Sequence, residues 1–269
     1  MAKLHVVTGK GGVGKTTYAM ALTNYFIEKG HRTFYVNLFD QESKETLEEL
    51  SIPSKHFEVS HSMKSYIARK LGSEMIAKWI SEAKFFKALF NILPSLGMMI
   101  VLGHILDELE KDPELKIVLD APATGHALTL FDSTNVFKKI FKEGTLVKDI
   151  VKINQFLYDE SKVQFHIISL PSELSLGEGQ ELESSLRNMG YKKSYFILND
   201  ALSLSSGIQE SSESLPEFLK KKIEYQKEVT KSFEDKLHIQ IPFIAKKDPK
   251  EIVTKLSSLL NQQGEAIEA

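Results

Sequence analysis

The chain of 269 residues contains no cysteine, and this absence excludes several kinds of site. Disulfide bonds, thiolate-bound zinc or metalloid and cysteine-held iron–sulfur clusters all need that side chain. A large excess of charge of one sign is also lacking, since 34 basic and 36 acidic residues leave a formal net charge of −2. A balanced chain has no overall positive field to hold it to nucleic acid, so no nucleic-acid partner is expected.

Long apolar runs without charge are scarce as well. One such run, residues 88–106, is long enough to span a bilayer, but it contains Pro94 together with glycines, an asparagine and a histidine. These residues favour two helices that meet near Pro94 over a membrane span. No charged segment followed by an apolar one precedes the first predicted strand, so a cytoplasmic location is expected. The composition, 42% hydrophobic, suits one large α/β domain.

A phosphate-binding motif lies close to the N-terminus. Residues 9–17 read Gly-Lys-Gly-Gly-Val-Gly-Lys-Thr-Thr after an apolar run, and they match the spacing G-x-x-x-x-G-K-[ST]. The N–H groups of such a loop and of the following helix N-terminus bind anions. Lys15 is expected to contact the β- and γ-phosphates, and Thr16 to bind Mg²⁺. The other candidate phosphate ligands are Gly11, Gly12, Val13, Gly14 and Thr17. A glycine-rich turn without a ligand is the alternative.

Lys10 places a second lysine inside this loop. With it, the string resembles the deviant phosphate loop of the family that holds the arsenite-pump ATPases, the tail-anchored-protein targeting ATPases and the positioning ATPases MinD and ParA. The resemblance implies a dimer, with an identical chain or a paralogue, in which Lys10 reaches the partner's nucleotide. There it would stabilise the transferring phosphoryl group as an arginine finger does. A solvated loop lysine is the alternative.

The pattern behind the motif predicts an α/β fold. Residues 16–29 read as a helix that ends at Gly30, and residues 33–37 read as a strand. Such a unit predicts a mostly parallel twisted sheet with helices on both faces. Asp40 follows the strand, and the resemblance implies that it orients or activates the attacking water. Gln41 stands where relatives have proline, and a helix N-cap is the alternative role for Asp40.

Two further segments, residues 62–111 and 135–158, show helical periodicity with more apolar residues than one buried face needs. We interpret them as a helical subdomain inserted into a single domain of residues 1–269. Their many Met and Phe side chains predict an apolar groove, closed in the dimer, for an apolar helical protein client or a membrane protein. Packing into the protein's own core is the alternative.

Residues 116–120 read as a buried strand that ends in Asp120, a candidate magnesium ligand. Residues 124–126, Thr-Gly-His, follow a few positions later. This pair of features is similar to the second switch of the arsenite-pump and tail-anchored-targeting branch, and differs from MinD and ParA. Gly125 would let the switch move when the γ-phosphate leaves. His126 is part of this switch motif, and the alternative is that it is a structural histidine.

The C-terminal half alternates strands and helices. Strands are predicted at residues 165–170, 195–199 and 238–243, and helices at residues 171–189, 217–236 and 249–260. By resemblance, Asn199 and Pro242 contact the adenine, whose edge matches an asparagine amide. In relatives a glutamate at the position of Ser172 contacts the partner's nucleotide. Because this chain has Ser172 there and Glu173 one residue later, that role is assigned to neither residue.

These features, together with the resemblance, predict an ATPase that binds ATP or ADP with Mg²⁺, forms a dimer and acts as a nucleotide-driven switch. Two alternatives remain. A positioning ATPase like MinD or ParA needs a membrane-binding helix or a basic DNA surface, and the acidic C-terminal end argues against both. A nucleotide-binding scaffold with little hydrolysis would fit the altered residues after Asp40.

Overall fold

The computed structural model describes residues 2–37, 44–57, 94–123, 127–128, 145–205, 208 and 214–263. Within them, seven strands form one sheet in the order β3-β2-β4-β1-β5-β6-β7, and all neighbours are parallel. The strands are β1 (Leu4–Gly9), β2 (Thr33–Asn37), β3 (Ser54–His56), β4 (Lys116–Asp120), β5 (Val163–Ser169), β6 (Ser194–Ala201) and β7 (Ile239–Pro242). The predicted parallel α/β fold is therefore confirmed.

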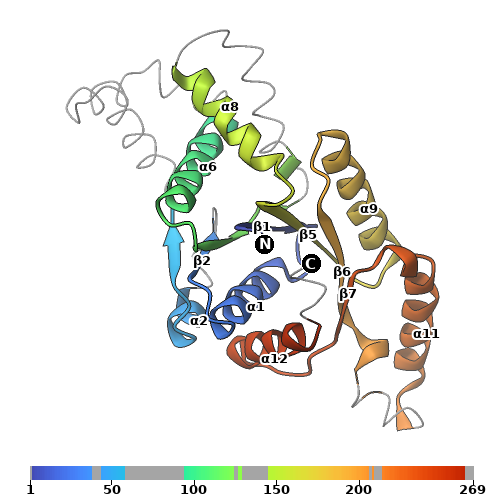
Figure 1. Ribbon diagram of the computed structural model, residues 1–269. Coiled ribbons are helices and arrows are strands. Elements are labelled where there is room, and N and C mark those ends of the chain that lie inside the picture. Colours follow the sequence, from blue (N-terminus) through green and yellow to red (C-terminus); the bar gives the residue numbers. More distant parts are fainter. Residues whose placement is uncertain are drawn as a thin grey trace.

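Helices cover both faces of the sheet (Figure 1). One face carries α1 (Lys15–Glu28), α2 (Lys44–Glu49) and α12 (Pro249–Gln262). The other carries α6 (Pro94–Lys111), α8 (Thr145–Leu157) and α9 (Glu173–Asn188). Beside α9, at the β6 end of the sheet, lies α11 (Glu217–Lys231). Two short 3₁₀ segments are η1 (Leu202–Leu204) and η3 (Glu234–Lys236).

Most predicted elements that the structure describes begin and end within two residues of their predicted bounds. The segment predicted as one helix over residues 217–236 is wrong in its second part, because α11 ends at Lys231 and η3 follows separately. The edge strand β3 was not predicted, since its three residues, Ser54–His56, are polar and largely exposed. The helix that begins at Pro94 is confirmed.

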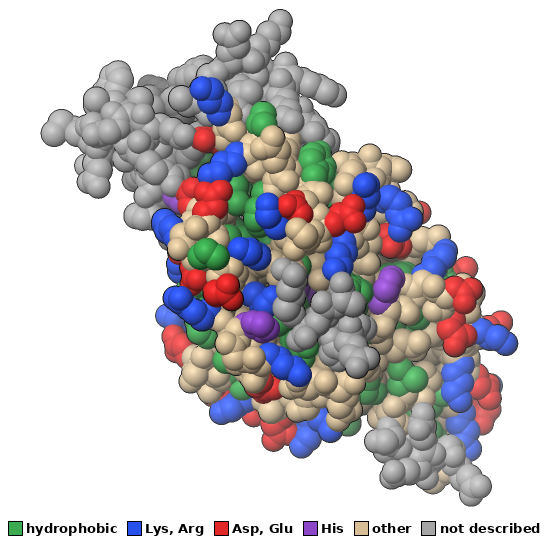
Figure 2. All heavy atoms as spheres, viewed as in Figure 1, with side chains coloured by type: hydrophobic (Ala, Val, Ile, Leu, Met, Phe, Trp, Pro, Cys, Tyr) green, Lys and Arg blue, Asp and Glu red, His purple; other side chains and the backbone are tan. Residues whose placement is uncertain are grey.

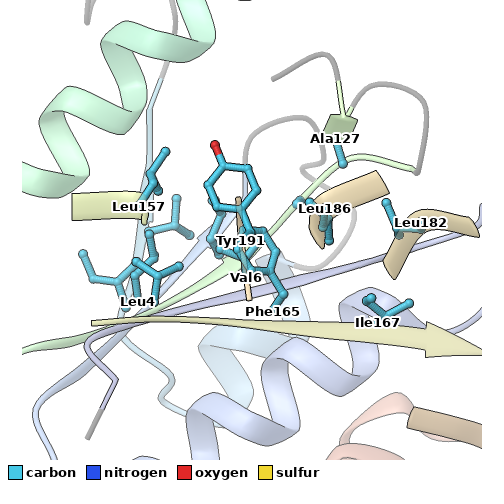
Figure 3. Close-up of a cluster of buried hydrophobic side chains, with 14 of the residues drawn as sticks. Leu4, Val6, Ala127, Leu157, Phe165, Ile167, Leu182, Leu186 and Tyr191 are labelled. Carbon is cyan, nitrogen blue, oxygen red and sulfur yellow. The ribbon is translucent and has the colours of Figure 1, made fainter. Parts of the chain in front are cut away.

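The core has two halves, one on each side of the sheet. Every residue of β1 is buried, as expected for a central parallel strand covered on both faces. On the α8 and α9 side, the ring of Tyr191 lies between Leu157 and Leu186 above Phe165 (Figure 3). Its centroid is 5.1 Å from that of Tyr158 and 5.2 Å from that of Phe165.

Most apolar residues of α6 and α8 whose side chains the structure describes are buried, and several belong to this core. In α6 the side chains from Met99 to Leu109 include seven buried apolar residues, and α8 contributes Ile150, Ile153 and Leu157. For these residues the core alternative holds, and they are unavailable to a client groove. Residues 62–93 and 135–144 of the predicted helical subdomain lie outside the described residues. Among the described helices, none combines the length and apolar character that a membrane crossing requires.

Acidic and basic side chains are interspersed on the face shown in Figure 2. No extended surface of a single sign is visible there, in keeping with the net charge of −2. The described residues of this face therefore form no basic patch of the kind that a DNA-bound positioning ATPase requires.

A buried chain of polar groups crosses the sheet beneath α1. His5 and His166 are fully buried, and a single set of neutral tautomers pairs every donor with an acceptor. Tyr18 Oη donates to His166 Nδ1 at 3.1 Å, His166 Nε2 donates to His5 Nδ1 at 3.1 Å, and His5 Nε2 donates to the Ala2 carbonyl at 3.2 Å. Burial lowers the pKa of His166 to about 3. The pKa of His5 is also lowered, mainly by burial and to a smaller extent by the charge of His166.

Acid is therefore expected to destabilise the fold through these histidines. In the unfolded chain these histidines bind protons near pH 6.5, whereas in the folded chain they stay neutral at that pH. The free energy of unfolding therefore decreases as the pH falls from about 6.5 toward 3. For His166 alone the loss between pH 7 and pH 5 is roughly 2 kcal/mol. Urea unfolding at both pH values measures it.

The variant His166→Gln should lose much of this pH dependence. His56→Gln is the matched control, because His56 is exposed on β3 and its replacement should leave the dependence unchanged. A His166→Gln protein that loses as much stability between pH 7 and pH 5 as the wild type would show that other groups cause the acid sensitivity.

Candidate functional site

The phosphate-loop motif forms the turn from β1 into α1. Gly14 caps α1 in the left-handed region with φ of 89°, and Gly12 has φ of 78°. Side chains with a Cβ rarely adopt these angles, so both positions need glycine. A Cβ added at Gly11 or Gly12 would meet no atom within 4 Å. The outer side of the loop therefore has room for a ligand close to its backbone.

The inner side of the loop is held tightly by the sheet. A Cβ on Gly9 would lie 2.3 Å from the carbonyl oxygen of Ile168 in β5, and one on Gly14 would lie 2.4 Å from Asn199 Nδ2. Asn199 Nδ2 also donates to the Val13 carbonyl at 2.9 Å. Asn199, predicted as an adenine contact, thus fixes the phosphate loop to β6.

Lys15 folds its side chain over the loop. Its Nζ donates to the Lys10 carbonyl at 2.8 Å, which places the ammonium group above the turn. Burial lowers the pKa of Lys15, and the negative charge of Asp120 opposes that shift. A partly desolvated cation beside positive-φ glycines and the N-terminus of α1 is an arrangement that attracts anions.

Thr16 and Asp120 meet although 104 positions separate them in the sequence. Thr16 Oγ1 donates to Asp120 Oδ2 at 2.7 Å, because β1 and β4 are parallel neighbours whose carboxyl ends lie side by side. A hydroxyl and a carboxylate are oxygen ligands of the kind Mg²⁺ takes from proteins. In the described ranges no group of three or more His, Asp or Glu side chains could hold a metal. A cation at Thr16 and Asp120 would therefore take its other ligands from phosphate and water.

Lys10 is paired within its own chain. Its Nζ donates to Glu178 Oε1 at 2.8 Å, and the two side chains are 41% and 35% exposed. Glu178 lies on α9 and was not singled out from the sequence, because the face that a helix presents is not fixed by its residue pattern alone. Beside this pair lies an open cleft of about 360 Å³. It is lined by Lys10, Gly11, Ala123, Leu128, Glu178, Glu181, Leu182 and Ser185.

The remaining predicted residues fall in different places. Asp40 and residues 124–126 lie outside the described residues. Ser172 is the N-cap of α9 and accepts a hydrogen bond from Ser175 N at 3.4 Å, whereas Glu173 is exposed. Pro242 ends β7 and pairs with Ala201, two residues beyond Asn199. The structure therefore brings Lys10, Lys15, Thr16, Asp120 and Asn199 together around one loop.

Comparison with known proteins identifies the family. The family model described as anion-transporting ATPase matches residues 2–148 and 142–261, almost the whole chain. The chain belongs to the anion-transporting ATPase family. This confirms the resemblance to arsenite-pump and tail-anchored-targeting ATPases. Membership in an ATPase family implies that the chain binds nucleotide.

Individual relatives of this chain are distant in sequence. ATPase GET3B of Arabidopsis thaliana is 23% identical over 269 residues, covering 76% of this chain and 65% of the relative. ATPase BagA of Mycobacterium tuberculosis is 22% identical over 220 residues, covering 73% and 64%. An arsenical pump-driving ATPase of Escherichia coli is 22% identical over 229 residues, covering 75% and 35%. The chain thus spans about two thirds of the first two relatives and about a third of the last.

Proposed function

We propose that this protein is a magnesium-dependent ATPase that works as a dimeric, nucleotide-driven switch. The observation that carries the proposal is the meeting of Lys15, Thr16 and Asp120 behind a glycine loop with an open outer side. Each of the three suits one part of a nucleotide–metal complex. A cytoplasmic location belongs to the same proposal.

The roles follow from the chemistry of each group. The backbone N–H groups of the loop bind phosphate oxygens, and Lys15 leaves the Lys10 carbonyl for the β- and γ-phosphates. Thr16 and Asp120 would hold Mg²⁺, which neutralises charge on the transferring phosphoryl group. Asn199 and Pro242 are assigned to the adenine side, where Asn199 keeps the loop in place through the Val13 carbonyl. Asp40 is assigned to the attacking water.

The dimer is supported by the surroundings of Lys10. The ion pair with Glu178 is half exposed, and such pairs stabilise by only about 0 to 1 kcal/mol, so Lys10 can leave it at little cost. One turn before Glu178 on α9, the side chain of Leu174 is 66% exposed. Tyr225 of α11 lies against the same end of α9, since its Oη accepts from Glu173 N at 3.4 Å, and it is 46% exposed. Lys10 is thus next to a partly apolar surface suited to a second subunit.

Sedimentation velocity with ADP and with a non-hydrolysable ATP analogue tests this switch. We expect a dimer with the ATP analogue and Mg²⁺ and a weaker association with ADP, because Lys10 gains a partner only where a γ-phosphate is present. Leu174→Glu should abolish the dimer while nucleotide still binds. Lys255→Glu, a change of charge on exposed α12, is the control and should leave the dimer intact. Equal masses with both nucleotides would contradict the switch.

The proposed client is an apolar helical protein segment or a membrane protein, and a paralogue is an alternative partner subunit. The client surface is proposed for the predicted helical segments, residues 62–111 and 135–158, without the side chains of α6 and α8 that are buried. An apolar helical peptide added to the sedimentation experiment should migrate with the dimer formed in the ATP analogue. A peptide that stays free in both nucleotide states would remove the client from the proposal.

A further inference from the structure

Asp120 receives a second hydrogen bond from a residue that phosphate-loop chemistry does not require. Tyr35 Oη donates to Asp120 Oδ2 at 2.9 Å, and this is the same oxygen that accepts from Thr16 at 2.7 Å. Asn37 Nδ2 in turn donates to Tyr35 Oη at 3.3 Å. The result is a continuous chain of donors from Asn37 through Tyr35 to the carboxylate.

Strand register explains how these side chains meet. β2 and β4 are parallel neighbours, with Tyr35 opposite Val118 and Asn37 opposite Asp120. Residues 35 and 37 point to the same face of the sheet, the face covered by α1. From two residues earlier on β2, the long tyrosine side chain brings its hydroxyl level with the end of β4. A shorter or apolar residue at position 35 would not reach the carboxylate.

The contact is buried and directed to a charged group. Tyr35 is 1% exposed, Asn37 is 8% exposed and Asp120 is 5% exposed, so water has little access to compete for these bonds. A hydrogen bond from a neutral donor to a carboxylate is shorter and stronger than one between neutral groups. Two donors converging on one oxygen fix the rotation of the Asp120 carboxyl group about its χ2 angle.

We propose that Tyr35, supported by Asn37, is a positioning residue that holds Asp120 for the cation of the nucleotide complex. The inference rests on the proposed function, because it assigns to Asp120 a role beside Mg²⁺. When the Thr16 hydroxyl turns from Asp120 to the cation, Tyr35 remains as the donor that keeps the carboxylate from rotating. Partners of this kind in other metal sites change metal affinity by about 10- to 100-fold when they are removed.

Tyr35→Phe tests the inference because it removes the hydroxyl and keeps the ring. ATP binding is titrated in EDTA and at a series of Mg²⁺ concentrations. We expect the Mg²⁺ concentration at half-effect to rise by about 10-fold in Tyr35→Phe, and the affinity measured in EDTA to stay unchanged. Tyr25→Phe is the matched control, since Tyr25 is a fully buried tyrosine at the far end of α1. It should leave both measurements unchanged.

The outcomes separate this inference from the proposed function. If the wild type binds ATP with an affinity that Mg²⁺ does not alter, the metal site fails and the inference fails with it. If Mg²⁺ strengthens binding equally in wild type and Tyr35→Phe, only the positioning role is wrong. A purely structural role would lower the ATP affinity measured in EDTA as well. Thermal unfolding of both tyrosine variants shows separately whether the substitution destabilises the fold. A parallel loss of affinity with and without Mg²⁺ would therefore also overturn the positioning role.

Discussion

Lys15→Ala is expected to weaken ATP binding by at least about 100-fold, which corresponds to about 3 kcal/mol. The ammonium group is held over the loop by the Lys10 carbonyl at 2.8 Å, beside open space next to Gly11 and Gly12. Removing it deletes a cation placed above these N–H groups, while the glycine backbone and the packing of α1 stay the same. Titration calorimetry with Mg-ATP measures the loss.

Lys29→Ala is the matched control for Lys15→Ala. Lys29 lies exposed at the C-terminal end of the same helix, so its removal should leave ATP affinity unchanged. Circular dichroism on both variants checks that the fold persists. An unaltered ATP affinity in Lys15→Ala would overturn the assignment of this loop as the nucleotide site.

Lys10→Ala is expected to keep nucleotide affinity and to lose turnover by about 100-fold or more, since one charged contact to the transition state supplies about 3 kcal/mol. The structure gives Lys10 a weak partner in its own chain, Glu178, and leaves the side chain 41% exposed. A lysine held this loosely is free to act across an interface. Phosphate release at saturating ATP measures the effect.

Glu178→Gln provides the matched control, because it frees Lys10 without removing its charge. It should retain turnover, whereas Lys10→Ala should lose it. Asp40→Asn should resemble Lys10→Ala, with ATP bound and hydrolysis stalled, if Asp40 orients the attacking water. If Lys10→Ala hydrolyses ATP as fast as the wild type, Lys10 has no catalytic role and is a solvated loop lysine.

The sequence predicts the central strands of the fold well because they are buried on both faces. β4 occupies the predicted residues, 116–120, and its five residues are all buried. Edge and surface elements carry weaker signals. β3 has only three residues, none of them buried, and the end of α11 at Lys231 is not marked by glycine or proline.

The candidate site is predictable where it depends on spacing and on where strands end. Lys15 and Thr16 follow from the motif, and Asp120 follows from the end of a buried strand beside β1. Tyr35 and Glu178 could not be identified in this way, because their contacts depend on side-chain length and on which face of an element points to the loop. Residues of those types are equally common in ordinary packing.

Phosphate release by the purified protein, with and without Mg²⁺, tests the central claim most directly. The account predicts Mg²⁺-dependent hydrolysis of ATP whose rate per chain rises with protein concentration, because Lys10 is proposed to act in a dimer. Lys15→Ala serves as the blank in the same assay. Wild-type release equal to the Lys15→Ala blank at every Mg²⁺ and protein concentration would contradict the ATPase, and would leave a nucleotide-binding scaffold as the function of this fold.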